Sequence, residues 1–255
     1  MTEPIIRIEN LSKSFAGQPV LTGVNLSVPA GGITVVIGKS GGGKSVLLKH
    51  IIGLMQPDSG EIYIAGQALS GLRGPARHAL RRKCSYMFQG MALFDSLTVF
   101  DNVALPLREK TRMTKAAIAA RVMEKIARLE LGDIAGKYPS QISGGMQKRV
   151  ALARAIAAQP DILFFDEPTT GLDPIMGAII DGLIVDCVKR LGSTAVAITH
   201  DMASAKRIGD RVAMIHKGRI IWSGHASALM DSGNPIVDQF THGRREGPIE
   251  MELRR

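Results

Sequence analysis

The chain has 255 residues, 45% hydrophobic and 22% charged, so it can bury a sizeable core without disulfides. Its net charge is +9, and the basic residues are scattered apart from short clusters such as Arg81-Arg82-Lys83. This positive charge fits a solvated face, or a partner that is nucleic acid or an anionic membrane surface. The two cysteines, Cys84 and Cys187, form no CxxC pair, which argues against a zinc site or disulfide framework and favours a reduced compartment.

Neither a membrane span nor a signal peptide is evident in the sequence. No apolar run approaches the ~18 residues that a spanning helix needs. The first residues, Met1-Thr2-Glu3-Pro4, lack the charged start and apolar stretch of a secretory signal. We therefore expect a protein that is soluble by itself.

The first part of the chain has the period of β-strands. Residues 5–8 and 24–28 alternate between apolar and polar side chains, as half-buried strands do. After a turn at residues 29–32, the continuous apolar run 33–37 predicts a buried parallel strand. A glycine-rich loop and a helical pattern over residues 44–54 follow. This order predicts strands first, then a strand–loop–helix unit.

The middle of the chain changes to helical spacing, from about residue 99 to residue 131. Thr114 precedes apolar residues at helical intervals, which predicts a capped amphipathic helix. We place a helical subdomain at about residues 90–157.

Strand character returns in the last third. We predict one long helix at residues 174–190. The predicted strands lie at residues 162–165, 194–198, 212–216 and 219–222. The tail after Gly233 is polar and reads as irregular. Alternation of strands and helices predicts an α/β core with a mostly parallel sheet, whose ligands bind where strands end. Chemistry is therefore expected after Ile37, Phe165 and Ile198.

A complete GxxxxGK[ST] phosphate loop follows the first of these strands. It reads Gly38-Lys39-Ser40-Gly41-Gly42-Gly43-Lys44-Ser45. Glycines let backbone N–H groups turn inward as an anion cradle, and the next helix points its positive end at the phosphates. We expect Lys44 to reach the β- and γ-phosphates and Ser45 to bind Mg²⁺. A flexible glycine loop without ligand is the alternative.

Two acids, Asp166 and Glu167, end the second strand. A carboxylate beside a phosphate loop suits Mg²⁺, so we assign Asp166 to the metal. Glu167 is placed to take a proton from the attacking water, as a general base. His200 follows the third strand and is positioned to contact the γ-phosphate and hold the water in line. Gln89 follows another apolar run, and its amide can touch both Mg²⁺ and the water.

A second anion site is predicted at residues 143–145. Ser143, Gly144 and Gly145 precede a helical pattern over residues 147–157, and a helix start can bind an anion. The alternative is a simple helix cap by Ser143. Two γ-phosphate sites in one chain make sense if the second serves the nucleotide of another copy.

Taken in order, these motifs resemble the ATP-binding cassette of ABC transporters, over about residues 4–230. The resemblance implies an α/β P-loop NTPase (RecA-like) core with an N-terminal antiparallel β subdomain and an inserted helical signature subdomain. It implies one domain over 1–232, with a catalytic core at 1–89 and 158–232 and the helical subdomain at about 90–157. The tail, 233–255, is either disordered or a contact to a dimer partner.

The resemblance also implies ATP and Mg²⁺ as cofactors and names the residues that bind them. Two cassettes stack head-to-tail, with each ATP between the phosphate loop of one copy and Ser143-Gly144-Gly145 of the other, and with Asp173 at the seam. Phe15 matches the aromatic that stacks on adenine, although tyrosine is commoner there and a core role is the alternative. For Mg²⁺, the expected ligands are Ser45, Gln89 and Asp166. The nucleotide-binding set is completed by the loop, listed as Gly38, Lys39, Ser40, Gly41, Gly42, Gly43, Lys44, Ser45 and Val46.

One departure from the family pattern points to a subfamily. The usual signature, Leu-Ser-Gly-Gly-Gln, reads Ile142-Ser143-Gly144-Gly145-Met146 here, with glutamine delayed to Gln147. This form of the signature is similar to that of the cassettes of Mla and Mce lipid transporters. It implies a phospholipid transport ATPase at the cytoplasmic face of an inner membrane, with a multi-span permease and an Mce-type lipid-binding protein as partners.

The segment Met91–Leu107 is apolar, and in this family the region receives the permease. The alternative for this segment is the core of the helical subdomain. Other functions remain: a cassette for another cargo, a non-enzymatic ATP switch, or a cassette that acts on nucleic acid or ribosomes. Ser143 follows Lys44 by 99 residues without coiled-coil heptads, which argues against a repair-type member. The intact acids and Lys44 argue against the non-enzymatic switch.

Overall fold

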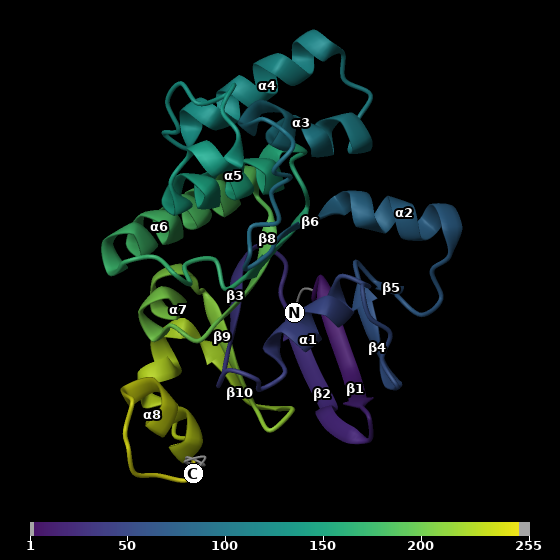
Figure 1. Ribbon diagram of the computed structural model, residues 1–255. Helices are drawn as coiled ribbons and strands as arrows, with labels where there is room; N and C mark the ends of the chain where they lie inside the picture. The colour runs from purple at the N-terminus through teal and green to yellow at the C-terminus, as the bar shows by residue number, and fades with distance from the viewer. Residues whose placement is uncertain (1–2, 250–255) are drawn as a thin grey trace. The chain divides into compact units, whose positions relative to one another are not determined.

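The computed structural model describes residues 3–249 and divides the chain into two compact units (Figure 1). The first unit comprises Met1–Pro29, Ile33–Gly71 and Ile198–Arg255, and the second comprises Ala30–Gly32 and Leu72–Ala197. Residues 1–2 and 250–255 lie outside the described residues, so the expectations for the first residues and for the end of the tail are only partly covered. Each unit is described by itself below.

The first unit contains a four-stranded antiparallel sheet with the order β2-β1-β4-β5. Its strands are β1 (Ile6–Phe15), β2 (Gln18–Val28), β4 (Ser59–Ile64) and β5 (Gln67–Ala68). Ile6 pairs with Val28 and Ile8 with Leu26, and all four side chains are buried. The period-two alternation of the sequence thus places one face of β1 and β2 in the core, which confirms the antiparallel N-terminal strands.

The first unit also contains the strand that leads into the phosphate loop. All of β3 (Gly32–Ile37) except its first residue lies here and pairs in parallel with β9 (Arg211–His216). β10 (Arg219–His225) runs antiparallel to β9. Among its described residues, the unit also contains the helices α1 (Lys44–Ile51), α7 (Met202–Ile208) and α8 (Pro235–His242) and the 3-10 helix η2 (Ala226–Asp231).

The second unit is built on β6 (Cys84–Met87), β7 (Ile162–Asp166) and most of β8 (Thr194–Thr199), in the order β8-β7-β6. β6 and β7 run in parallel. Every residue of β7 and β8 is buried, as the continuous apolar runs predicted. The helices of the unit are α2 (Gly74–Lys83), α3 (Val99–Lys110), α4 (Lys115–Arg128), η1 (Pro139–Gln141), α5 (Gly144–Ala157) and α6 (Pro174–Leu191).

Three helices of the second unit, α3, α4 and α5, pack against one another (Figure 1). The helical stretch expected over residues 99–131 is interrupted where α3 ends at Lys110. The Thr114 hydroxyl then accepts a hydrogen bond from the Ala117 amide and caps α4, as predicted. Ile118, Val122 and Ile126 form the buried face of α4. The proposed boundary of a helical subdomain at about 90–157 stays a prediction.

The expectation of an irregular tail after Gly233 is wrong for its first part. Asn234 accepts hydrogen bonds from the amides of Ile236 and Val237 and starts α8, which ends at Gly243 with φ of 62°. Val237 and Gln239 are buried, and the Gln239 side chain bonds both the amide and the carbonyl of Ile249. An asparagine cap, proline at the first helical position and glycine after the helix are local signals that the polar composition concealed.

Candidate functional site

The phosphate loop joins β3 to α1 in the first unit, and its shape demands glycine. A Cβ atom on Gly38 would lie 2.4 Å from the carbonyl oxygen of Ile215, closer than real Cβ atoms approach backbone. Gly41 and Gly43 have φ of 75° and 95°, in the left-handed region. Gly43 is the residue before α1, so the positive end of that helix opens onto the loop. This is a cradle of the kind that holds phosphate.

Lys44 is the buried cation of this loop. Its side chain is only 6% exposed, and its ammonium donates to the carbonyl oxygens of Gly38 and Lys39 at 2.8 and 3.1 Å. Ser45 and Val46 are half-buried in the first turn of α1, whereas Ser40 is exposed at the tip of the loop. The donor set, a buried ammonium beside glycine backbone and a helix start, fits an oligophosphate.

Two further predicted residues, Phe15 and His200, belong to the first unit. Phe15 ends β1 and is 42% exposed, so the alternative of a core residue is wrong. The Lys13 ammonium lies 5.7 Å from its ring centroid. His200 follows β8 and is exposed, between Thr199, whose hydroxyl accepts from the Asp201 amide, and the start of α7. Both side chains are thus exposed in the first unit.

The two acids at the end of β7 are buried in the second unit. Asp166 and Glu167 are each 7% exposed. The Tyr86 hydroxyl donates to Asp166 at 3.0 Å, and burial together with the nearby carboxylate raises the pKa of Tyr86 far above its usual value. Glu167 has φ of 49°, rare for a residue with a side chain, and accepts from the Thr170 hydroxyl at 3.1 Å. Such backbone strain clusters at functional sites.

The structure adds a residue that the sequence reasoning missed. Lys148 of α5 is 4% exposed, and its ammonium donates to the backbone carbonyl of Gln89 at 3.3 Å. Burial lowers the pKa of Lys148, while the negative charge of Glu167 opposes that shift. Gln89, Lys148 and Glu167 are thereby linked within the second unit. A lysine inside a helical pattern carries no signal in the sequence that would single it out.

The residues predicted as a second anion site form a helix start. Ser143 caps α5, and its hydroxyl accepts from the Met146 amide at 3.3 Å, so the cap geometry is confirmed and phosphate contact stays a prediction. The helix starts at Gly144, three residues before the predicted pattern. A Cβ atom on Gly145 would lie 2.9 Å from the Met176 side chain of α6. Asp173 caps α6 through the amides of Ile175 and Met176.

The delayed glutamine of the signature has a structural role. Gln147 donates from its side-chain amide to the carbonyl oxygens of Pro139 and Ile142, at 2.9 and 3.3 Å. These bonds fasten the turn before α5 to the helix itself. The displacement of glutamine by one position thus leaves Ser143, Gly144 and Gly145 at the helix start, with Met146 and Gln147 behind them.

The segment Met91–Leu107 was predicted to be either a permease interface or part of the core, and its two parts differ in this respect. We call residues 89–97 the docking loop. Phe94 in this loop is 51% exposed, and Phe88, just before it in the chain, is 37% exposed. The α3 part is core, because Val99, Val103 and Leu107 are buried. Phe88 and Phe94 are thus the exposed aromatic side chains that an interface at this loop would use.

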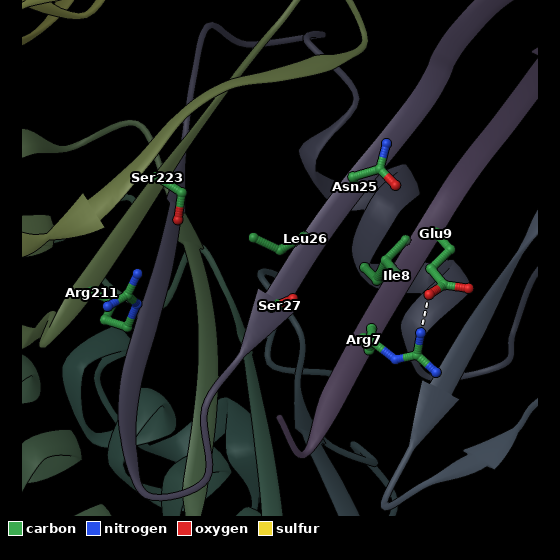
Figure 2. A pocket seen from close by; sticks show the side chains of 8 residues that line it. All are labelled: Arg7, Ile8, Glu9, Asn25, Leu26, Ser27, Arg211 and Ser223. Carbon is green, nitrogen blue, oxygen red and sulfur yellow. Dashed lines mark hydrogen bonds and ion pairs between the residues drawn. The ribbon is translucent and has the colours of Figure 1, made fainter. Parts of the chain in front are cut away.

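A cavity of about 420 Å³ lies in the first unit, and none of the predicted site residues is among those that line it. Figure 2 shows its lining, with an ion pair between Arg7 and Glu9 on one side and Arg211 on the other, and Leu26 between them. The remaining lining residues are Ile8, Asn25, Ser27 and Ser223. Ile8 and Leu26 are core side chains of the sheet, so the hollow is a gap beside the core that polar residues border.

Residues 3–249 contain neither a membrane-spanning helix nor a protein-only metal cluster. No helix there combines the length and apolar character that a membrane crossing requires. In the same residues, no cluster of three or more His, Cys, Asp or Glu side chains could hold a metal ion. A Mg²⁺ site of the predicted kind needs only one carboxylate beside substrate phosphates, and Asp166 is a buried carboxylate of that type.

Comparisons with known proteins agree with the geometry. A family model described as ABC transporter matches residues 21–170. The chain is 39% identical over 246 residues to the "probable ribonucleotide transport ATP-binding protein mkl" of Mycobacterium tuberculosis, covering 96% of this chain and 68% of that protein. It is 37% identical over 245 residues to the "intermembrane phospholipid transport system ATP-binding protein MlaF" of Escherichia coli, covering 96% and 91%.

A solved structure extends the likeness to three dimensions. The ATP-binding cassette MJ0796, in a dimeric post-hydrolysis state bound to ADP and Pi, superposes with a TM-score of 0.79. The two sequences are 33% identical, and the alignment covers 87% of this chain and 98% of the other.

Proposed function

Because the chain belongs to the ABC transporter family as an ATP-hydrolysing cassette, we propose that it powers phospholipid transport between two membranes through a separate permease. The observation that carries this cargo is the likeness to the MlaF protein of E. coli over 96% of this chain and 91% of that one. The signature with Met146 in place of glutamine supports the same subfamily. The cassette acts at the cytoplasmic face of an inner membrane, as a peripheral subunit.

A second cargo has a specific observation in its favour. The mycobacterial relative, whose name refers to ribonucleotide transport, is 39% identical over 96% of this chain. A cassette supplies the energy of ATP hydrolysis and does not recognise the cargo. Its fold therefore does not discriminate between phospholipid and ribonucleotide as cargo. The permease that co-purifies with the cassette decides between them.

ATP binds at the phosphate loop in this proposal. Backbone N–H groups of residues 38–45 and the Lys44 ammonium contact the phosphates, the start of α1 supplies positive potential, and Phe15 stacks on adenine. Mg²⁺ neutralises phosphate charge when bound, and Ser45, Asp166 and Gln89 are its protein-side donors. Tyr86 supports the buried Asp166 through its hydrogen bond.

Glu167 and His200 act on the attacking water. The buried Glu167 carboxylate takes the proton of the water, and the Thr170 hydroxyl orients that carboxylate. His200 hydrogen-bonds the γ-phosphate and keeps the water in line. Phosphoryl transfer needs positioning and charge stabilisation more than covalent help, which these residues supply. Glu167→Gln removes the base while retaining shape, so this variant binds ATP and hydrolyses it at least a hundredfold more slowly, within the range of a general base.

Two copies of the chain form the working unit. Each ATP is held by the phosphate loop of one copy and by Ser143, Gly144 and Gly145 of the other, with Asp173 at the seam. ATP closes this homodimer because it contacts both copies, and hydrolysis removes the bridge. The closed dimer of the Glu167→Gln variant with Mg-ATP is observed by light scattering, and a Ser143→Trp substitution in the same background prevents it.

The permease binds at the docking loop, and an Mce-type lipid-binding protein completes the assembly. Exposed Phe88 and Phe94 are the anchors. The tail from residue 233, whose first part is α8, lies against the dimer partner.

Purification of the tagged chain from native membranes tests the proposal. Wild type recovers a permease, an Mce-type protein and bound phospholipid, and Phe94→Asp loses all three while keeping basal ATPase activity. Recovery of a permease without lipid or an Mce protein refutes the phospholipid cargo, and absence of ATPase activity in the wild type refutes the enzyme.

A further inference from the structure

The docking loop is held to the rest of the second unit by side chains rather than by regular secondary structure. Asn102 of α3 is fully buried, and its side-chain amide lies within hydrogen-bond distance of four backbone atoms, with its two N–H groups shared among three carbonyls. It accepts from the Phe94 amide at 2.9 Å and donates to the carbonyls of Phe94, Leu97 and Thr98 at 3.0–3.1 Å. This fixes the end of the loop that presents Phe94.

The other end of the loop is held from α5. The Arg154 guanidinium donates from one nitrogen to the Ala92 carbonyl at 2.7 Å and from the other to the Met91 carbonyl at 2.6 Å. Met91 and Ala92 both have positive φ, 60° and 48°, which costs free energy unless the surroundings enforce it. A planar fork with two charge-assisted bonds suits that enforcement.

Helix α5 contacts the docking loop at a second point, and the signature residues lie at the start of this helix. Lys148 donates to the Gln89 carbonyl. Ser143 caps the start of α5. From Ser143 to Arg154 the helix spans about 16 Å at 1.5 Å per residue, a single rigid segment. A displacement of the helix start is therefore transmitted to the carbonyls of Gln89, Met91 and Ala92.

We propose that Arg154, assisted by Lys148, is a positioning residue that couples the docking loop to α5, so that the loop moves when Ser143 engages nucleotide. The inference rests on the proposed function, since it takes Ser143 as a nucleotide contact and the loop as the permease site. Arg154 contacts neither nucleotide nor the attacking water. Its loss uncouples the loop without removing the machinery for hydrolysis.

Hydrogen–deuterium exchange of the purified full chain, in the Glu167→Gln background with and without Mg-ATP, tests the coupling. In that background ATP lowers exchange at the start of α5 and in the docking loop together. Arg154→Gln retains the response at the start of α5 and loses it in residues 90–94, where exchange without nucleotide rises about tenfold. Arg154→Lys, which keeps the positive charge but lacks the planar two-nitrogen fork, restores part of the loop response.

The matched control is Arg149→Gln. Arg149 lies on the same helix and donates to the backbone carbonyl of Glu130 at 3.3 Å, outside the loop. We expect the Arg149→Gln variant to keep the loop response to ATP. A loop response in Arg154→Gln equal to that of the parent, or a parent loop that ignores ATP, overturns the coupling. Loss of ATP binding or of basal hydrolysis in the wild type instead overturns the proposed function.

Discussion

Replacing Tyr86 with phenylalanine tests how the buried Asp166 is supported. The substitution removes one hydroxyl group, which donates to Asp166 at 3.0 Å, while Asp166 is 7% exposed. A hydrogen bond to a charged group contributes about 1.5–3 kcal/mol, and phenylalanine recovers part of this because it has no hydroxyl to desolvate. We expect the free energy of unfolding to fall by about 1–2 kcal/mol.

The assay is urea denaturation followed by circular dichroism at pH 7.5, with EDTA and without nucleotide. The matched control is Tyr63→Phe, which deletes the same hydroxyl but keeps the ring that packs against the Arg7 guanidinium, 4.1 Å from the ring centroid. We expect the control to change stability by less than about 0.5 kcal/mol. If Tyr86→Phe also stays within that limit, the hydroxyl does not support Asp166 and the reasoning fails.

Three further predictions concern stability and reactivity. Burial raises the pKa of Cys84 and Cys187 to about 11, so both thiols react with iodoacetamide at pH 8 about a hundredfold more slowly than a free thiol. Because the unfolded chain loses these protons first, stability falls as pH rises from about 9 towards 11, and a Cys84→Ala, Cys187→Ala double variant shows a smaller fall. Asn102→Ala removes the side-chain amide that bonds four backbone atoms through its oxygen and two N–H groups, which lowers the free energy of unfolding by about 2–4 kcal/mol and speeds proteolysis of the docking loop. Gly38→Ala sets a Cβ atom 2.4 Å from a backbone oxygen and costs about 1–3 kcal/mol in thermal or urea unfolding, whereas Gly144→Ala, in open space, costs nothing measurable.

The family, the fold class and the enzymatic activity could be predicted because they depend on local patterns. The run of residues 33–37 followed by the phosphate loop, and the run of residues 162–165 followed by Asp166-Glu167, each join a strand to its chemistry within a few positions. The predicted α/β fold with an antiparallel N-terminal sheet is confirmed. The assignment of single residues to ATP and Mg²⁺ stays a prediction.

The prediction of an irregular tail failed because it rested on composition and not on local capping signals. The composition after Gly233 suggested an irregular chain, yet Asn234 and Pro235 start a helix and Gly243 ends it. Average polarity says little about a short helix on a surface, because most of its side chains face solvent. Caps are specific where composition is not.

By itself the sequence determined the main strands, the helix caps at Thr114 and Ser143 and the phosphate-loop motif, because those depend on neighbours along the chain. Only the tertiary structure decided that Tyr86 supports Asp166, 80 positions away, and that Arg154 holds carbonyls 62 and 63 positions away. It also decided that Phe15 is exposed and that Lys148 lies against Gln89. These depend on how separate elements pack, and no periodicity along the chain encodes which distant backbone atom a side chain will reach.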